Sequence, residues 1–284
     1  MADTNEDMDV MNEDDMDDEE FFEAIKGILM AIQAIIHLDC MGAIDGTHIP
    51  AMVKGPEISA YPNRYGKTSQ NVLAATNFDL EFIYVLSGWE GSAHDSRVLN
   101  DALTRRNWLK LPPGKFLLVD AGFANRSGFL APIRGVRYHL KEFSGQGCHP
   151  ENARDLFNLR HASLRNVVER IFGVLESRFT IFKTAPLFPF KTQAELMLAC
   201  AGLHNFLRKE CRSDLFPVEP EDEEDSEHEE DPEDEFQTQD QQREEANDWR
   251  MEMANHMWRD ARPAPDPEPN PPPVVEGNNA AEQS

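Results

Sequence analysis

The sequence has little cysteine and no long hydrophobic run, and each shortage excludes a class of protein. Only 4 of the 284 residues are cysteine, and none of them forms a CxxC pair. Such spacing gives neither a zinc ribbon nor a disulfide framework, and it fits a reducing compartment. The most apolar stretch, residues 21–37, is interrupted by Glu23, Lys26 and Gln33 and is too short to span a bilayer.

Positive charge is missing from both ends of the chain. Residues 1–20 contain 11 acids and no Lys or Arg, which excludes a secretory signal at this end, and residues 219–284 contain 23 acids and 4 bases. Blocks of this kind repel themselves and bury little apolar surface. We therefore predict disordered acidic tails at 1–20 and 219–284, the second Pro-rich, with a short amphipathic helix at 244–260.

The middle of the chain has the opposite balance. Residues 21–218 hold 23 Lys or Arg against 18 acids, although the whole chain carries −25. About 200 residues are enough for one substantial core, so we predict a single domain at 21–218. Its mild positive charge is compatible with a nucleic acid partner, and the acidic tails could screen this basic face or compete with DNA for it.

Hydrophobic periodicity indicates an α/β domain. Apolar steps of three and four residues predict helices at 22–36, from Ser163 to about 178, and at 192–209, the last with an apolar stripe of Leu196, Cys200, Leu203 and Leu207. Short apolar runs predict strands at 40–45, 71–78, 82–89 and 116–120, with the middle two paired as a hairpin. A further helix begins near His94 with Asp95 or Ser96 as its cap, and the segment between Asp120 and Ser163 shows no period and is expected to be an irregular loop.

Three carboxylates stand where apolar runs meet polar surroundings. Asp45 and Asp120 close the runs MGAID and FLLVD, and Glu169 lies within SLRNVVERIFGVLESRF. Carboxylates from separate elements can hold two divalent cations about 3.5–4 Å apart, which activate water for in-line attack on phosphorus. The competing interpretation is structural, since an Asp after a strand is often a turn residue or cap and Glu169 can pair with Arg165 or Arg170.

Other polar residues also have two interpretations. His48 and His94 lie close to carboxylates in the sequence, so they belong either to the edge of an active site or to ordinary hydrogen bonds. A basic segment interleaved with Phe129 and Tyr138 is predicted either to follow a phosphate backbone and stack on bases or to be a solvated loop. Its candidate DNA contacts are Arg126, Arg134, Arg137 and Lys141.

Several strings are familiar as a set: GAIDGTHI, SQNVLAATNFDLEFIYVLSGWEGSAHDSRVL, FLLVDAGF, GFLAPIRGVRYHL, LRNVVERIFGVLESRF and LHNF. From about Cys40 to Arg208 the chain resembles the PIF/Harbinger transposase-derived nucleases, including the plant proteins related to the antagonist of like heterochromatin protein. The resemblance implies an RNase H-like mixed sheet flanked by helices, a Mg²⁺ or Mn²⁺ cofactor, a DNA substrate and a nuclear location, with the cytoplasm as a second one. It implies that Asp45, Asp120 and Glu169 form the catalytic, metal-binding triad. Asp95 is the alternative to Asp120 as a metal ligand, or a residue that supports the ligands without contacting the metal.

The sequence departs from the family pattern at its N-terminal end. Relatives carry a helix-turn-helix-like DNA-binding region before the first Asp, whereas only about forty residues precede Asp45 here, and the first 20 of them include 11 acids. We therefore expect either a truncated chain or dependence on a separate Myb-like partner. Two alternatives to an active nuclease stay open: a domesticated interaction module for chromatin-associated proteins, and a fragment of a decaying element.

Overall fold

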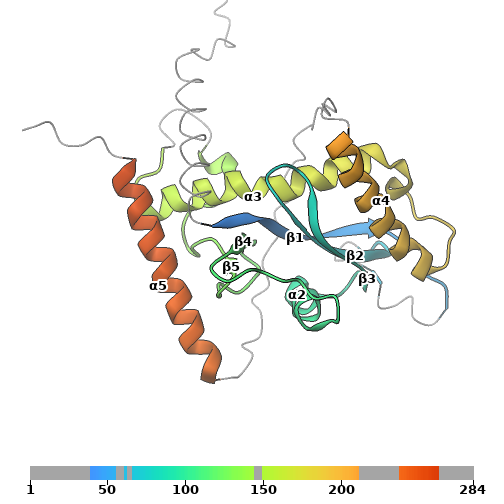
Figure 1. Cartoon of the computed structure of the whole chain (residues 1–284), viewed down its shortest axis with the longest axis horizontal. Coiled ribbons are helices and arrows are strands. Elements are labelled where there is room, and N and C mark those ends of the chain that lie inside the picture. The colour runs from blue at the N-terminus through green and yellow to red at the C-terminus, as the bar shows by residue number, and fades with distance from the viewer. Residues whose placement is uncertain (1–38, 56–60, 63–65, 144–148, 211–236, 262–284) are drawn as a thin grey trace, which may run out of the picture.

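A five-stranded mixed sheet with strand order β3-β2-β1-β4-β5 forms the centre of the molecule (Figure 1). The computed structural model describes residues 39–55, 61–62, 66–143, 149–210 and 237–261. The strands are β1 (Cys40–Pro50), β2 (Ser69–Thr76), β3 (Phe82–Glu90), β4 (Phe116–Leu118) and β5 (Phe129–Leu130). Antiparallel pairing joins β1, β2 and β3, whereas β1, β4 and β5 are parallel. This arrangement confirms the α/β class and the RNase H-like mixed sheet.

The predicted hairpin is present as β2 and β3. Its turn is closed by Asn77, whose Oδ1 accepts hydrogen bonds from the backbone N–H of Asp79 at 3.1 Å and of Glu81 at 2.9 Å. Leu80 takes a positive φ of 57° within this turn. The Asn77 side chain thus bonds to the backbone two and four residues later. These bonds replace part of the strand pairing at the turn, so a short connection is enough to join β2 to β3.

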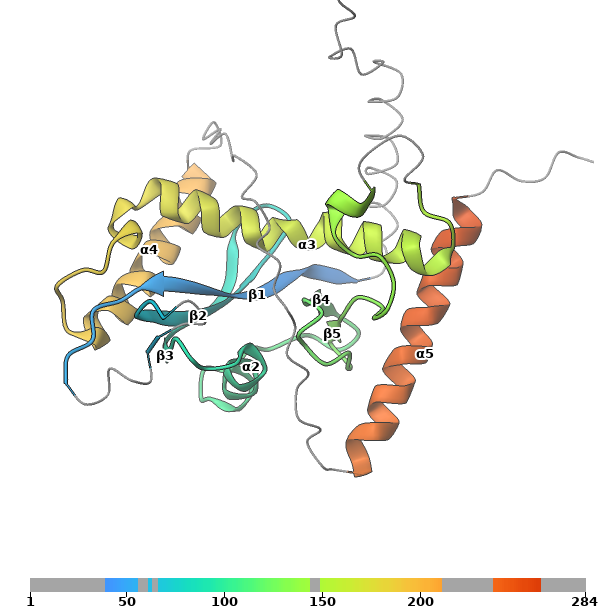
Figure 2. The same ribbon diagram turned by 180° about the vertical axis from the view of Figure 1, so that it is seen from behind.

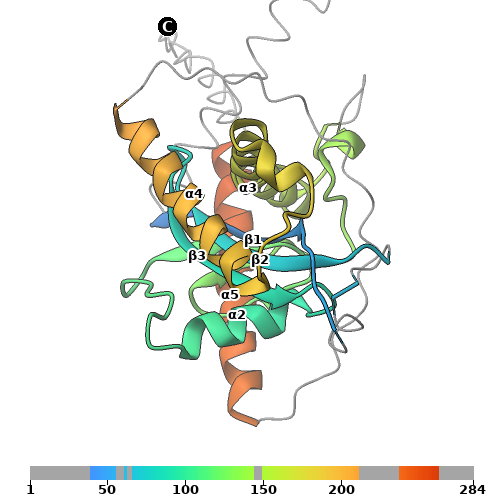
Figure 3. The ribbon, with the colours of Figure 1, turned by 90° about the vertical axis from the view of Figure 1, so that its right-hand side faces the viewer.

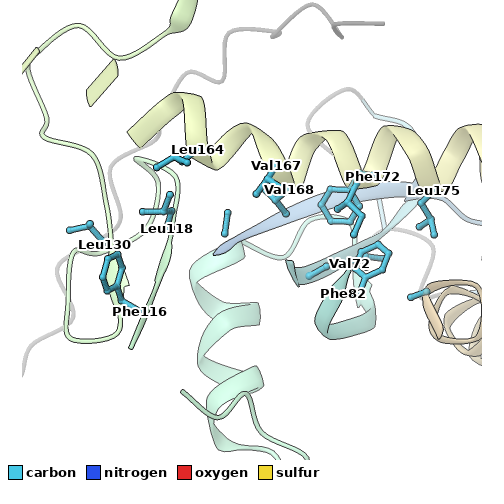
Figure 4. Close-up of a cluster of buried hydrophobic side chains, with 14 of the residues drawn as sticks. Val72, Phe82, Phe116, Leu118, Leu130, Leu164, Val167, Val168, Phe172 and Leu175 are labelled. Carbon is cyan, nitrogen blue, oxygen red and sulfur yellow. The ribbon is translucent and has the colours of Figure 1, made fainter. Parts of the chain in front are cut away.

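Helices cover the two faces of the sheet. Helix α3 (Ala153–Arg178) lies over one face and α2 (Asp95–Thr104) over the other (Figure 3). Side chains of a strand alternate between the faces, so Val72 packs beneath α3 while Leu73 packs beneath α2. On the α3 side, apolar residues of the helix point at the strands (Figure 4); those labelled are Leu164, Val167, Val168, Phe172 and Leu175.

Helix α3 begins ten residues before the Ser163 that periodicity indicated. Asn152 caps it, since its Oδ1 accepts from the N–H groups of Arg154 and Asp155, each at 3.0 Å. The segment expected to be irregular therefore contains the first turns of α3, together with β5 and the 3-10 helix η2 (Leu140–Phe143). A two-residue strand is too short to leave a periodic signal in the sequence.

The cap of α2 also differs from the expectation. His94 is the capping residue, and its ring nitrogen accepts from the N–H of Ser96 at 3.3 Å, so neither Asp95 nor Ser96 has this role. Asp95 is the first helical residue, which frees its carboxylate for the bond to Asn71 described below.

Helix α4 (Phe190–Glu210) buries a different stripe from the one predicted. The inward residues are Gln193, Met197, Ala201 and His204, whereas Leu203 is 46% exposed. The reason is polar: His204 and Gln193 are held inside by hydrogen bonds to backbone groups of the sheet and its loops. Periodicity follows apolar residues and misses such anchors. The short 3-10 helix η3 (Thr180–Lys183) connects α3 toward α4.

Helix α5 (Gln237–Asp260) lies at the opposite end of the molecule from α4 (Figures 1 and 2). It is longer than the predicted 244–260 helix, and it packs on the core rather than standing apart in a tail. Met253 and Met257 are buried in the core beneath α3, and the ring of Trp249 meets that of Phe116 edge-on at 5.1 Å. The guanidinium of Arg250 donates to the carbonyl of Pro132 at 2.7 Å.

Some sequence predictions fall on residues that the structure does not describe. The 22–36 helix, the acidic tail at 1–20, and the segments 211–236 and 262–284 lie outside the described residues, so the domain and tail boundaries stay predictions. Within the described helices, none is long and apolar enough to cross a membrane.

Candidate active site

Strand register brings two of the three carboxylates together. Ala43 of β1 pairs with Leu118 of the parallel strand β4, and both side chains belong to the core beneath α3. Two residues further along a strand the side chain returns to the same face. Asp45 and Asp120 therefore lie side by side on the α3 face of the sheet.

Arg165 joins this pair to the third carboxylate. Its Nη1 donates to Asp45 Oδ2 at 2.6 Å, and its Nη2 donates to Glu169 Oε1 one helical turn later in α3. Its Nε donates to the hydroxyl of Tyr138 at 2.8 Å. The charge of Asp120 also helps to raise the pKa of Arg165, although only Asp45 and Glu169 hydrogen-bond to the guanidinium.

Charge within this cluster is unbalanced. Burial raises the pKa of Asp45 to about 8; the Arg165 guanidinium opposes the rise, while the nearby carboxylates of Asp120 and Asp95 add to it. The N–H of Gly46 donates to Asp45 Oδ1 at 2.8 Å and also favours the ionised form. With a pKa of about 8, Asp45 holds a proton near neutral pH, and a bound cation would take the place of that proton beside Asp120 and Glu169.

Arg165 itself stays charged in this environment. Burial by itself would lower its pKa, but Tyr138, Asp45, Glu169 and Asp120 raise it well above the ordinary value. Only 11% of its side chain is exposed. A buried, permanently charged guanidinium between two carboxylates acts as an internal counter-ion for the cluster.

Asp95 lies behind the cluster, on the α2 side of the sheet. Its Oδ1 accepts from Asn71 Nδ2 at 2.7 Å, and it occupies the space beside Gly46, where an added Cβ would meet that same oxygen at 2.4 Å. Gly46 therefore has to be glycine for Asp95 to approach β1 this closely. Asp95 influences Asp45 through its charge, but Asp120 shares the face of Asp45 and is the better triad candidate.

The cluster matches a hard divalent cation in donor type and in charge, since Mg²⁺ and Mn²⁺ prefer carboxylate oxygens. As the side chains stand, no three His, Cys, Asp or Glu residues of the described segments are close enough to hold a metal ion. Arg165 lies between Asp45 and Glu169, where a bridging cation would compete with it. The ligand set fits the metal, and access to it requires Arg165 to release Asp45.

The basic segment divides into residues with different surroundings. Arg134 is exposed and donates to the carbonyl of Ala121 at 3.1 Å, directly beside Asp120. Arg137 is committed to Asp155, with Nη2 2.6 Å from Oδ2. Arg126 lies over the ring of Phe129 at 5.0 Å. The side chain of Lys141 is outside the described part of the structure.

The two aromatic residues of this segment have different surroundings. Phe129 is only 4% exposed and packs in the core beneath α2, so its ring is not available to stack on bases. The hydroxyl of Tyr138 accepts a hydrogen bond from Arg165, and base stacking by its half-buried ring stays a prediction. Of the four candidate DNA contacts, Arg134 is the one whose exposure and place next to Asp120 suit a phosphate contact.

Histidines near the carboxylates make structural hydrogen bonds. His48 Nδ1 lies 3.3 Å from the hydroxyl of Ser69, and His94 caps α2. His161 is buried beneath the sheet edge; its Nε2 lies 2.9 Å from the carbonyl of Leu130, and burial lowers its pKa to about 4. It is therefore a neutral donor to that carbonyl.

Sequence reasoning missed the central position of Arg165 and Tyr138. The sequence left Arg165 and Arg170 both open as partners of Glu169, and the structure shows the ion pair with Arg165, four residues earlier. The second bond, to Asp45, crosses 120 residues of sequence, and no local pattern indicates it.

A strand pair and a helix that bring acidic side chains to one face of an RNase H-like sheet are the arrangement expected of the DDE type. The model of a family described as DDE superfamily endonuclease matches residues 44–205, and the chain belongs to this family. The matched segment runs from the middle of β1 to Asn205 of α4. It includes all three carboxylates and excludes α5.

Curated relatives agree with the family assignment. The human protein named "Putative nuclease HARBI1" is 28% identical over 198 residues, which cover 66% of this chain and 53% of that protein. The Arabidopsis thaliana protein named "Protein ALP1-like" is 25% identical over 186 residues, covering 60% of this chain and 43% of its own length. The chain thus spans about half the length of the curated relatives it matches. No solved structure matches it. These relatives confirm the resemblance to transposase-derived nucleases.

Proposed function

We propose that this protein is a metal-dependent DNA endonuclease acting in the nucleus, with Asp45, Asp120 and Glu169 as the metal-binding triad. The observation that supports this most is the placement of these carboxylates around Arg165 on a single face of the sheet. Burial and repulsion from neighbouring carboxylates raise the pKa of Asp45 to about 8, so a bound cation would replace the proton that Asp45 holds near neutral pH.

Each side chain has a defined task under this proposal. Bound Mg²⁺ or Mn²⁺ would activate water and stabilise the leaving oxygen of the phosphodiester. Asp45 and Asp120, fixed by the parallel strands β1 and β4, would hold the cation from the sheet, and Glu169 would complete the site from α3. Arg165 stabilises the carboxylates of Asp45 and Glu169 and would have to release Asp45 for it to hold a cation. Tyr138 positions Arg165 during this exchange.

Substrate contact is assigned to the exposed basic side of the site. Arg134 lies next to the Asp120 end of the cluster and is solvent-exposed, so its guanidinium can donate to a phosphate oxygen. Arg137 is held by Asp155 and contributes to the shape of the loop instead.

A plasmid-nicking assay with the full chain in Mg²⁺ or Mn²⁺ tests the proposal. Asp45→Asn, Asp120→Asn and Glu169→Gln should each reduce cleavage by about 100-fold or more, because each removes a charged metal ligand. Asp95→Asn is the matched control: it makes the same chemical change on the other face of the sheet and keeps an oxygen for Asn71. Cleavage by Asp45→Asn at the wild-type rate, with its circular dichroism unchanged, would refute the site.

A second candidate function is supported by the same guanidinium. Arg165 already satisfies Asp45 and Glu169, so the fold is stable without a cation and can serve as a chromatin-associated interaction module that no longer cuts. The two functions differ in metal affinity. Absence of cleavage at every metal concentration, together with unchanged partner binding by Asp45→Asn, would favour the module.

A further inference from the structure

An open hollow of about 400 Å³ lies at the N-terminal ends of β4 and β5, whereas Asp120 follows the C-terminal end of β4. Its walls are the loop that leads from α2 to β4 and the turn that leads into β5, and they include Trp108 and Arg126. Two of its buried lining residues, Leu109 and Phe129, belong to the core beneath α2. The hollow is therefore on the α2 side of the sheet and separate from the carboxylate cluster.

Two tight turns fix the walls of the hollow. Residues 112–115 form the first, closed by a bond of 3.0 Å from the last N–H to the first carbonyl, and Gly114 has a φ of 78°. Proline followed by glycine at positive φ is typical of a type II turn. Residues 126–129 form the second turn, in which a Cβ at Gly128 would lie 3.0 Å from Leu111 Cδ1. The two walls thus touch each other and are already formed, which lowers the ordering cost of binding.

Trp108 gives the hollow a large exposed ring. Its side chain is 46% exposed, whereas the next residue, Leu109, is 2% exposed and its N–H donates to the carbonyl of Ala102 at 2.8 Å. Lys110 Nζ lies 5.3 Å from the centre of the Trp108 ring. An exposed tryptophan on an anchored backbone, with a basic group beside it, is a platform on which a nucleic acid base can stack.

The hollow is basic although the whole chain carries −25. Lys115 and Arg126 are among the described residues that line it, and none of those residues is acidic. Lys115 is paired with Asp39, but Arg126 makes no ion pair with any described residue and lies over the ring of Phe129 at 5.0 Å. Burial lowers the pKa of the Arg126 guanidinium, which still stays charged. A partly buried guanidinium without a carboxylate partner suits an anionic group such as a phosphate.

We infer that this hollow binds single-stranded DNA, with a base stacked on Trp108 and a phosphate oxygen bonded to the guanidinium of Arg126. The choice of DNA rests on the proposed nuclease function. The choice of a single strand follows from the exposed ring, because the paired and stacked bases of a duplex offer no free face. The contact is additional to the triad, since the five residues of extended chain from Lys115 to Asp120 span roughly 17 Å.

Fluorescence anisotropy of a fluorescein-labelled oligothymidylate, titrated with the full chain in EDTA, tests the stacking contact. A length of about 12 nucleotides is within the range that one single-strand site covers. Trp108→Ala should raise the dissociation constant about tenfold with unchanged circular dichroism, whereas Trp108→Phe, which keeps a ring, should stay within about threefold of the wild type. Phe206→Ala is the matched control and should bind like the wild type, because Phe206 is 58% exposed on α4, at the other edge of the sheet (Figure 1).

Salt dependence of the same titration tests the phosphate contact. Arg126→Gln should weaken binding and reduce the slope of the logarithm of affinity against the logarithm of salt concentration by about 0.7, the value for one phosphate of a single strand. Lys183→Gln is the control for charge, since Lys183 is exposed in η3 and makes no ion pair with a described residue. This variant should leave the slope unchanged.

Several outcomes would overturn the inference. They are absence of binding by the wild type, binding that Trp108→Ala and Arg126→Gln both leave unchanged, and equally tight binding of a duplex of the same length. A polyglutamate peptide that displaces the oligonucleotide as well as unlabelled oligothymidylate does would assign the hollow to an acidic protein segment instead. Asp45→Asn should bind the oligonucleotide like the wild type and fail to nick plasmid DNA, so failure of this inference is distinguishable from failure of the proposed nuclease.

Discussion

Asp45 and Gly46 are consecutive residues of β1, yet the two faces of the sheet that they define are stabilised in different ways. On the α3 face, Arg165 donates to Asp45 and Glu169, and the charge of Asp120 acts on the same guanidinium, so carboxylates outnumber cationic groups. On the α2 face, Asp95 is alone and its Oδ1 is held by a neutral amide, that of Asn71. The first arrangement leaves a demand for cations, and the second is closed by a hydrogen bond. The comparison teaches that a carboxylate such as Asp95 can lie near an active site without being a metal ligand.

The largest expected effect comes from removing the counter-ion. Arg165→Met leaves the largely buried Asp45 and the 35% exposed Glu169 without their partner, which should lower the free energy of unfolding by about 3 kcal/mol in metal-free buffer. Chemical denaturation measures this loss. If the α3 face needs positive charge, Mn²⁺ should recover part of the lost stability in this variant. A loss below about 1 kcal/mol would show that the ion pairs contribute little.

A smaller effect is expected on the other face. Asn71→Ala removes the bonds from Asn71 Nδ2 to Asp95 Oδ1 and to the carbonyl of Ala93 at 3.0 Å. Because both acceptors are left unsatisfied, the cost should be about 2 kcal/mol, measured by thermal and urea unfolding. Mn²⁺ should not restore this stability. Rescue by Mn²⁺ equal to that of Arg165→Met would abolish the distinction between the faces.

The pH dependence of stability should sharpen the contrast further. The pKa of Asp45 is about 8 in the folded protein and near its ordinary 3.8 when unfolded, so the native state holds the proton more tightly. The stabilisation that protonated Asp45 contributes is fully present at pH values below the unfolded pKa, and it is lost as the pH rises through 8. Relative to Asp45→Asn, the wild type should lose about 1 kcal/mol between pH 7 and pH 8. A constant difference between the two proteins across this range would contradict the raised pKa.

Much of the sheet was predictable because its strands have strong local signals. The β2–β3 hairpin has β-branched and aromatic runs around a short polar turn, and the Asp45 and Asp120 positions follow from the ends of apolar runs. An ion pair of Glu169 with a neighbouring arginine of its helix also followed from the sequence. These features depend on residues close together in the sequence.

What could not be predicted depends on contacts between distant segments. The rotation of α4 is set by His204 and Gln193 bonding to backbone far away in the sequence, which reverses the expectation that Leu203 is inward. The early start of α3 depends on Asn152, which caps the helix. No apolar periodicity in the sequence marks this start. The link between Arg165 and Asp45 requires β1 and α3 to be packed already.

Calorimetric titration of Mn²⁺ into the wild type, Glu169→Gln and Asp95→Asn tests the central claim, that the α3 face is a cation site and the α2 face is not. The account predicts saturable binding by the wild type and by Asp95→Asn, and its loss in Glu169→Gln. Equal binding by all three proteins, or loss of binding in Asp95→Asn alone, would contradict it.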